Sequence, residues 1–241
     1  MRKVLLTVCM AVLLVGPAVH AADMTDLMKA LPAIPSGGSA QDSGTVASGL
    51  KEALSVGTKN AVGVLSKANG YFGNEAVKIL LPENVRRVGD ALRMAGYQKE
   101  VDAFVLSMNR AAEKAAPKAA DIFAGAIQSM SVDDAQKILN GGNTAATEYF
   151  KSKTSSKLFD AFKPDISQSM NEVGVTKAYK AMTDRYTTMM PFAKMDSLDL
   201  DKYVTDKSLD GLFHMVGREE TKIRTNPAAR TTDLLKKVFT K

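Results

Sequence analysis

The sequence predicts an all-α fold in which amphipathic helices pack around one apolar core. Apolar residues recur at the spacing of one helix face along most of the chain, and alternating apolar and polar runs typical of strands are missing. The chain has many alanines, 13 methionines and no tryptophan, which suits close packing of helix on helix. We expect a single bundle-like domain of about nine helices at residues 46–241.

The first residues have the parts of a secretory signal peptide. Arg2 and Lys3 precede an apolar run at 4–15. Gly16–Pro17 then break this run, which is shorter than the roughly 20 residues that a membrane-spanning helix requires. We therefore expect residues 1–21 to be cleaved after Ala21. The mature protein should be periplasmic or secreted, without a transmembrane span.

Cleavage would also remove side chains on which many enzymes depend. Cys9 is the only cysteine, and with residues 1–21 gone His214 is the only histidine. A zinc site or a Ser-His-Asp triad then has too few of its usual groups. Glycine motifs for phosphates or dinucleotides are missing as well. We expect no metal and no cofactor.

The charge balance bears on possible partners. Loss of Arg2 and Lys3 reduces the 32 basic residues to 30, against 26 acidic residues. Charges of both signs alternate along the chain, whereas nucleic-acid binders concentrate a larger basic excess on one face. We expect no nucleic-acid partner.

A flexible tether is expected at residues 22–45, because Pro32, Pro35 and the stretch SGGSAQDSGT are too polar to bury a core. The helices should follow in order. Apolar stripes predict helices at 46–67 and 97–116, and a helix between Pro82 and Gly96 has a proline start and a glycine end.

The second half of the chain continues this pattern. After a helix at 118–130, Ser131 should cap the next helix in a variant capping box with Asp134, and Asn140–Gly142 should end it. Pro164 should kink or split its helix, and Asn226 should cap a last helix that has Pro227 at its first position. These later helices are expected at 144–152, 155–172, 175–190, 199–223 and 227–239.

Several segments together resemble a known family. They are LKEALSVGTKNAV (50–62), LSMNRAAEKAAPKA (106–119), DAQKILNGGNTAATEYF (134–150), VGVTKAYK (173–180) and KIRTNPAARTTDLLKKVF (222–239). They resemble the bacterial domain-of-unknown-function family catalogued under the number 4197, over the chain from about residue 46 to its end. The resemblance implies an exported helical protein and supplies no catalytic residues.

The segment SMNRAAE contains the first candidate site. Arg110 and Glu113 are three residues apart and can meet on one helix face, beside Asn109. Such an arginine can bind a carboxylate or phosphate of a ligand. The alternative, which we favour, is an ion pair within the protein that braces helix packing.

The segment KIRTNPAARTTDLLKK contains the second candidate site. Arg224, Asn226 and Arg230 bring cations to a helix start, where free backbone N–H groups attract anions. The alternative, again favoured, is that these residues tie the last helices together. Two adjacent carboxylate pairs are expected to be structural: Asp133–Asp134 as helix-start charges and Glu219–Glu220 on a solvated face.

These observations favour a non-catalytic binding or envelope-support module that contacts a lipid or another envelope protein. The alternative is a hydrolase-type enzyme that uses Arg110, Glu113 and Arg230. An enzyme should gather these groups in a water-accessible cleft. A lipid carrier should instead enclose an apolar cavity.

Overall fold

The regular structure in the described part of the chain is helical throughout. The computed structural model describes residues 43–172, 174–191 and 199–239, so the expected signal peptide and nearly all of the expected tether lie outside it. The α-helices are α2 (Ser43–Leu65), α3 (Glu83–Met94), α4 (Gln98–Ala115), α5 (Ala119–Gln128), α6 (Val132–Asn140), α7 (Ala145–Glu172), α8 (Val175–Met189), α9 (Leu200–Thr225) and α10 (Asp233–Phe239). Short 3-10 helices occur at Ala116–Lys118 and Pro227–Ala229.

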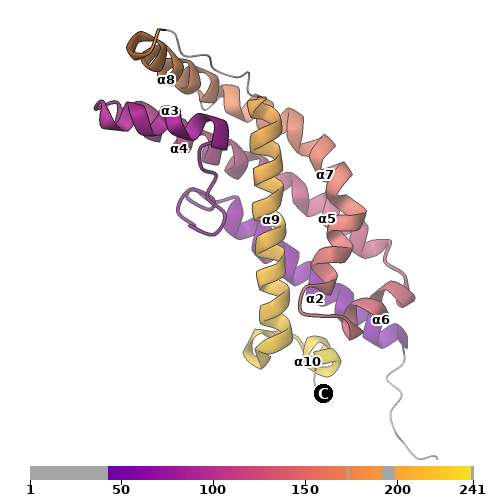
Figure 1. Ribbon diagram of the computed structural model, residues 1–241. Helices are drawn as coiled ribbons and strands as arrows, with labels where there is room; N and C mark the ends of the chain where they lie inside the picture. The colour runs from indigo at the N-terminus through magenta and orange to yellow at the C-terminus, as the bar shows by residue number, and fades with distance from the viewer. Residues whose placement is uncertain (1–42, 173, 192–198, 240–241) are drawn as a thin grey trace, which may run out of the picture. The chain divides into compact units, whose positions relative to one another are not determined.

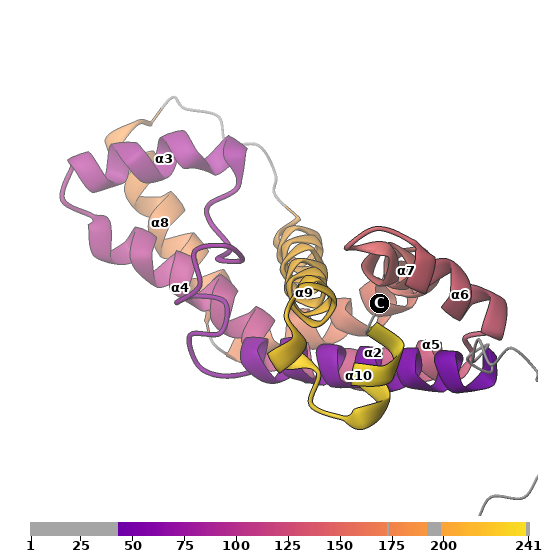
Figure 2. The same ribbon diagram turned by 90° about the horizontal axis from the view of Figure 1, so that it is seen from below.

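The helices pack as one all-α domain, as the sequence predicts. The described residues belong to one compact unit. Within it, α9 crosses α2 and runs beside α7, while α4 packs against α7 and α8 (Figures 1 and 2). The last helix, α10, lies against α2. Helices from both ends of the sequence therefore share one core.

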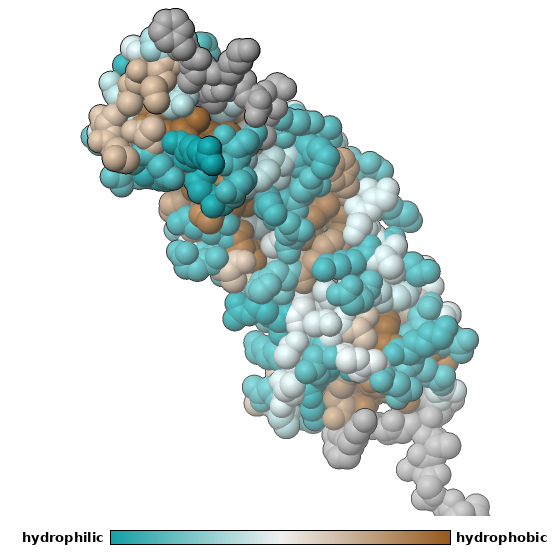
Figure 3. All heavy atoms as spheres, viewed as in Figure 1, coloured by the Kyte–Doolittle hydropathy of each residue, from teal (hydrophilic) through white to brown (hydrophobic). Residues whose placement is uncertain are grey.

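Aromatic side chains occupy the centre of this core. Phe123 lies 5.2 Å from Phe150 and 6.1 Å from Phe213, measured between ring centroids. Phe104 and Phe162 are fully buried in the same cluster. Each such side chain contributes about 1.5–3 kcal/mol when it leaves water. In the view of Figure 3, apolar atoms show mainly in the seams between helices, with hydrophilic atoms on either side.

Several helix boundaries differ from the prediction. Helix α2 begins at Ser43 rather than at residue 46. The expected helices at 144–152 and 155–172 are one helix, α7, and Pro164 lies inside it without splitting it. The hydroxyl of buried Thr154 donates to the Phe150 carbonyl 2.7 Å away, so this threonine is satisfied in the middle of the helix and does not end it.

The expected helix at 227–239 is also wrong, because it is divided. Asn226 accepts a hydrogen bond from the Ala228 N–H at 3.0 Å, but it caps only a single 3-10 turn. Arg230 leaves the helical conformation, with φ −85° and ψ 81°, and its guanidinium donates to carbonyls at the end of α9. A new helix then starts where the Thr232 hydroxyl accepts from the Leu235 N–H.

The capping box of α6 is confirmed. The Ser131 hydroxyl accepts from the Asp134 N–H at 3.0 Å, and the Asp134 carboxylate accepts from the Ser131 N–H at 3.1 Å. Hydrogen bonds from the side chain and backbone of Ser131 hold the pKa of Asp134 below its usual range. Asp133 lies beside it as a helix-start charge, as expected.

This box should make the start of α6 sensitive to acid. The pKa of Asp134 is lower in the folded state than in the unfolded chain. The ionised carboxylate therefore stabilises the fold fully at pH values above the ordinary aspartate pKa, and this stabilisation is lost as the pH falls through the lowered pKa of the folded state. Titration followed by NMR should give a pKa for Asp134 below the ordinary aspartate range. Ser131→Ala should raise it toward the ordinary range, and an unchanged value would contradict the box.

Gly211 permits the close contact between α9 and the segment 66–82, which links α2 to α3. A Cβ atom at this position would lie 2.8 Å from Cε1 of buried Tyr71. A Cβ atom at Gly217, on the same helix, would lie 3.5 Å from the hydroxyl oxygen of Thr147, which is an ordinary van der Waals contact. Of these two glycines of α9, only Gly211 is therefore required for packing.

This difference gives a matched pair of variants. Gly211→Ala should lower the free energy of unfolding by about 1–2 kcal/mol, because overpacking against Tyr71 outweighs the gain in helix propensity. Gly217→Ala should instead raise it by up to about 1 kcal/mol. Urea unfolding measures both, and equal effects at the two positions would show that the Tyr71 contact is not tight.

Candidate functional site

The first predicted cluster holds the segment 66–82 against α4. One carboxylate oxygen of Glu113 accepts hydrogen bonds from the N–H groups of Tyr71 and Phe72, each at 3.1 Å. The other oxygen pairs with Arg110, whose guanidinium also donates to Asn69 at 2.8 Å. Glu113 is buried, and the ion pair with Arg110 is the internal one that the spacing indicated. The pair braces packing in this structure.

Asn109 makes a second attachment to the same segment. Its side chain accepts from the Ile79 N–H at 2.9 Å and donates to the carbonyls of Ile79 and Val105, each at 2.8 Å. The residue is completely buried. It therefore satisfies both backbone groups of Ile79, which would otherwise be costly to bury.

Tyr71 fastens this segment to α9 as well. Its hydroxyl donates to the Ser208 carbonyl at 2.8 Å, and the side chain is completely buried. Burial raises the pKa of the Tyr71 hydroxyl far above its ordinary value, and the Glu113 carboxylate raises it further. Tyr71 is thus a neutral donor that joins the segment 66–82 to α9.

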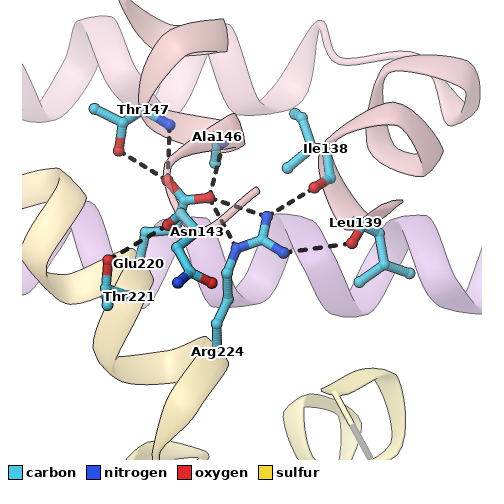
Figure 4. A network of polar contacts seen from close by, with 8 residues as sticks. All are labelled: Ile138, Leu139, Asn143, Ala146, Thr147, Glu220, Thr221 and Arg224. Carbon is cyan, nitrogen blue, oxygen red and sulfur yellow. Dashed lines mark hydrogen bonds and ion pairs between the residues drawn. The ribbon is translucent and has the colours of Figure 1, made fainter. Parts of the chain in front are cut away.

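The second cluster centres on Glu220, which is buried on α9 (Figure 4). Its carboxylate accepts from the N–H groups of Ala146 and Thr147, each at 2.9 Å, and from the Thr147 hydroxyl at 2.8 Å. Arg224 pairs with the same carboxylate at 3.0 Å and donates to the Ile138 carbonyl at 2.7 Å. The network joins the start of α7, the end of α6 and α9.

Glu220 is the residue that the sequence interpretation missed. The expectation that Glu219–Glu220 lie on a solvated face is wrong for Glu220, which has 7% exposure. A signal was present, because Glu220 continues the buried stripe of Val216 and Ile223 at helical spacing, and Arg224 follows four residues later. The carboxylate occupies the N-terminus of α7, where an external anion would otherwise bind.

The remaining candidates lie at the end of α9. Arg230 donates to the carbonyls of Ile223 at 3.1 Å and Arg224 at 2.9 Å, so it covers the C-terminal end of that helix. Asn226 caps the following turn. Arg224, Asn226 and Arg230 are thus brought together, and their contacts are with the protein itself.

The two clusters are separate. Asn109, Arg110 and Glu113 each contact the segment 66–82, whereas Arg230 contacts the end of α9. Arg110 and Glu113 pair with each other, but Arg230 has no hydrogen bond or ion pair with either of them among the described residues, so the three groups of the enzyme alternative are not brought together. Every buried polar side-chain atom in the described ranges has a hydrogen-bond partner.

An apolar cavity lies beside the Glu220 network, between α2, α7 and α9. Its volume is about 20 Å³, and Leu54, Phe150 and Phe239 are among its lining residues. Such a volume accommodates about one water molecule. Pockets for small organic ligands measure roughly 300–1,000 Å³, so this cavity does not match the chamber of a lipid carrier.

Larger hollows are open to solvent, and two of them lie between α7 and α9. One has a volume of about 580 Å³ and the next about 530 Å³, and both are lined by Lys151 and Phe213. His214 is exposed at the edge of the first. We call the two together the α7–α9 groove. Its remaining lining residues are Thr144, Thr147, Glu148, Ser155, Ser156, Phe159, Asp206, Leu209, Asp210, Gly217, Arg218, Thr221, Lys222 and Thr225.

Neither a metal-ligand cluster nor a membrane-spanning helix occurs in the described ranges. No group of three or more His, Cys, Asp or Glu residues within these ranges is arranged to hold a metal ion. None of the helices in the same ranges combines the length and apolar composition of a membrane span.

Comparison with known proteins gives a family and no activity. The family model described as "Protein of unknown function (DUF4197)" matches residues 40–240. No curated protein and no solved structure matches the chain. The match covers the whole helical domain and agrees with the resemblance of the segments noted above. The chain belongs to the DUF4197 family.

Proposed function

We propose that the domain is an exported, non-catalytic binding module of the bacterial envelope that recognises another envelope protein through its outer surface. The observation that carries this proposal is the direction of the candidate polar groups. Glu113 and Glu220 face backbone N–H groups of the protein itself. The apolar interior has a cavity of only about 20 Å³, whereas the α7–α9 groove is large and open.

The signal peptide expected at residues 1–21 supports export, and the family match supports a self-contained domain. A lipid carrier is the less favoured partner class, because burial of an acyl chain needs an apolar chamber. Contact with a protein needs only a surface of suitable shape and charge.

Photo-crosslinking in the native bacterium tests this proposal. A photoreactive amino acid is placed at Ser155 in the α7–α9 groove, at exposed Leu80 before α3 and at exposed Lys99 on α4. We expect a mature protein lacking residues 1–21 outside the cytoplasm, and a discrete crosslinked envelope protein from at least one position. Cytoplasmic retention, or the lack of any protein adduct from all three positions, would contradict the proposal.

A further inference from the structure

The α7–α9 groove consists of two adjoining hollows. Its two hollows share Lys151 and Phe213, and Lys151 lies with its Nζ atom 6.0 Å from the centroid of the Phe213 ring. Gly217 has no side chain to narrow the first hollow. In Figure 3 apolar atoms follow the line between α9 and α7, with hydrophilic atoms beside them. The groove therefore has room for an extended or helical chain segment.

One half of the groove is basic. Lys151, Arg218 and Lys222 line the first hollow with His214, against the single carboxylate of Glu148. Lys151 lies 4.0 Å from Glu148, and Lys222 lies 3.7 Å from Glu219 outside the hollow. The exposed Arg218 guanidinium has no hydrogen bond, ion pair or ring contact within the described part of the chain. This half presents an uncompensated positive charge centred on Arg218.

The other half is balanced in charge. Asp206 pairs with Lys202, and Asp210 pairs with Lys207 at 3.0 Å, both along α9 itself. The apolar part of this hollow is formed by Phe159 and Leu209 with the shared Phe213. An occupant therefore meets positive charge at one end and apolar surface with hydroxyl groups along the rest.

We propose that the α7–α9 groove binds an acidic, amphipathic segment of a protein partner, with Arg218 as the main charge contact. This proposal rests on the proposed function, and it specifies which surface binds the partner and what chemistry the partner segment has. Carboxylates complement the Arg218 end, and apolar side chains of the same segment complement Phe159 and Leu209, as in helix-in-groove recognition. A lone phosphate or lipid headgroup would satisfy the charge and leave most of the groove empty.

Binding of an acidic probe tests the charge contact. A fluorescein-labelled oligo-glutamate peptide is titrated with the mature protein, with inorganic phosphate and phosphatidylglycerol vesicles as competitors. We expect binding that weakens with salt and weakens about tenfold in Arg218→Glu. Arg87→Glu, which makes the same charge change at an exposed position on α3, should change it less than about twofold.

Three results would overturn the proposal. One is equal weakening by Arg218→Glu and Arg87→Glu, since net charge alone would then explain binding. Another is preferential binding of the vesicles through Arg218, which would make the partner a membrane. The third is displacement of the peptide by inorganic phosphate at equal charge concentration. Circular dichroism of both variants checks that they fold.

The crosslinker at Ser155 separates this proposal from the broader one. We expect its adduct to contain a partner peptide rich in Asp or Glu, with a yield reduced at least about fivefold by Arg218→Glu and unchanged by Arg87→Glu. A partner peptide without acidic residues would overturn the groove assignment. Protein adducts from Leu80 or Lys99 alone would also overturn it, while leaving the proposed function in place.

Discussion

Replacement of Glu220 by alanine should destabilise the protein by about 3–5 kcal/mol, because it leaves a largely buried arginine and two buried N–H groups without their partner. The affected groups are Arg224 and the N–H groups of Ala146 and Thr147. This loss is a large part of the roughly 5–15 kcal/mol that stabilises a typical domain. Urea unfolding followed by circular dichroism measures it.

Glu148 provides the control for this variant. It also lies near the start of α7, but its side chain is 66% exposed and its lysine partner is 4.0 Å away. Glu148→Ala should therefore change the free energy of unfolding by less than about 1 kcal/mol. Comparable losses in Glu148→Ala and Glu220→Ala would contradict the role given to the buried network.

Replacement of Glu113 by alanine should have the second largest effect, a loss of about 2–4 kcal/mol. It removes the acceptor for the N–H groups of Tyr71 and Phe72 and the partner of Arg110. The loss is expected to be smaller than for Glu220, because the Arg110 side chain is 31% exposed and can be hydrated. Hydrogen exchange should show faster exchange at Tyr71 and Phe72.

Glu172→Ala is the matched control. Glu172, on α7, pairs at 2.8 Å with Lys114, which lies next to Glu113 on α4. Both of these side chains are about half exposed. Loss of Glu172 should lower stability by less than about 1 kcal/mol and leave exchange at Tyr71 unchanged. A stable Glu113→Ala variant with unchanged exchange would show that the carboxylate does not hold the segment 66–82.

Local patterns in the sequence were sufficient for the helices and for contacts within them. The stripe of α4, the capping box of Ser131 and Asp134, and the pair of Arg110 and Glu113 all depend on residues close in sequence. Glu220 was different, because its partners Ala146 and Thr147 precede it by more than 70 residues. Only the packing of α9 beside α7 brings them together.

The same reasoning explains the errors at helix boundaries. The sequence predicted separate helices at 144–152 and 155–172 and a kink or split at Pro164. Helix α7 instead packs against α4 and α9 along its length, and that packing favours a continuous helix. The break before α10 depends on Arg230 reaching back to carbonyls of α9. Tertiary contacts of this kind leave no periodic signal in the sequence.

The central claim is that Glu113 and Glu220 maintain the fold, whereas the α7–α9 groove makes the functional contact. The most direct test combines Glu113→Gln with the photoreactive residue at position 155. The crosslinking yield of this protein is measured and divided by the fraction of the protein that is folded, which urea unfolding gives. We predict a lower unfolding midpoint and an unchanged yield per folded molecule. A variant that unfolds like the wild type but gives no crosslink would contradict the claim, because Glu113 would then belong to the functional site.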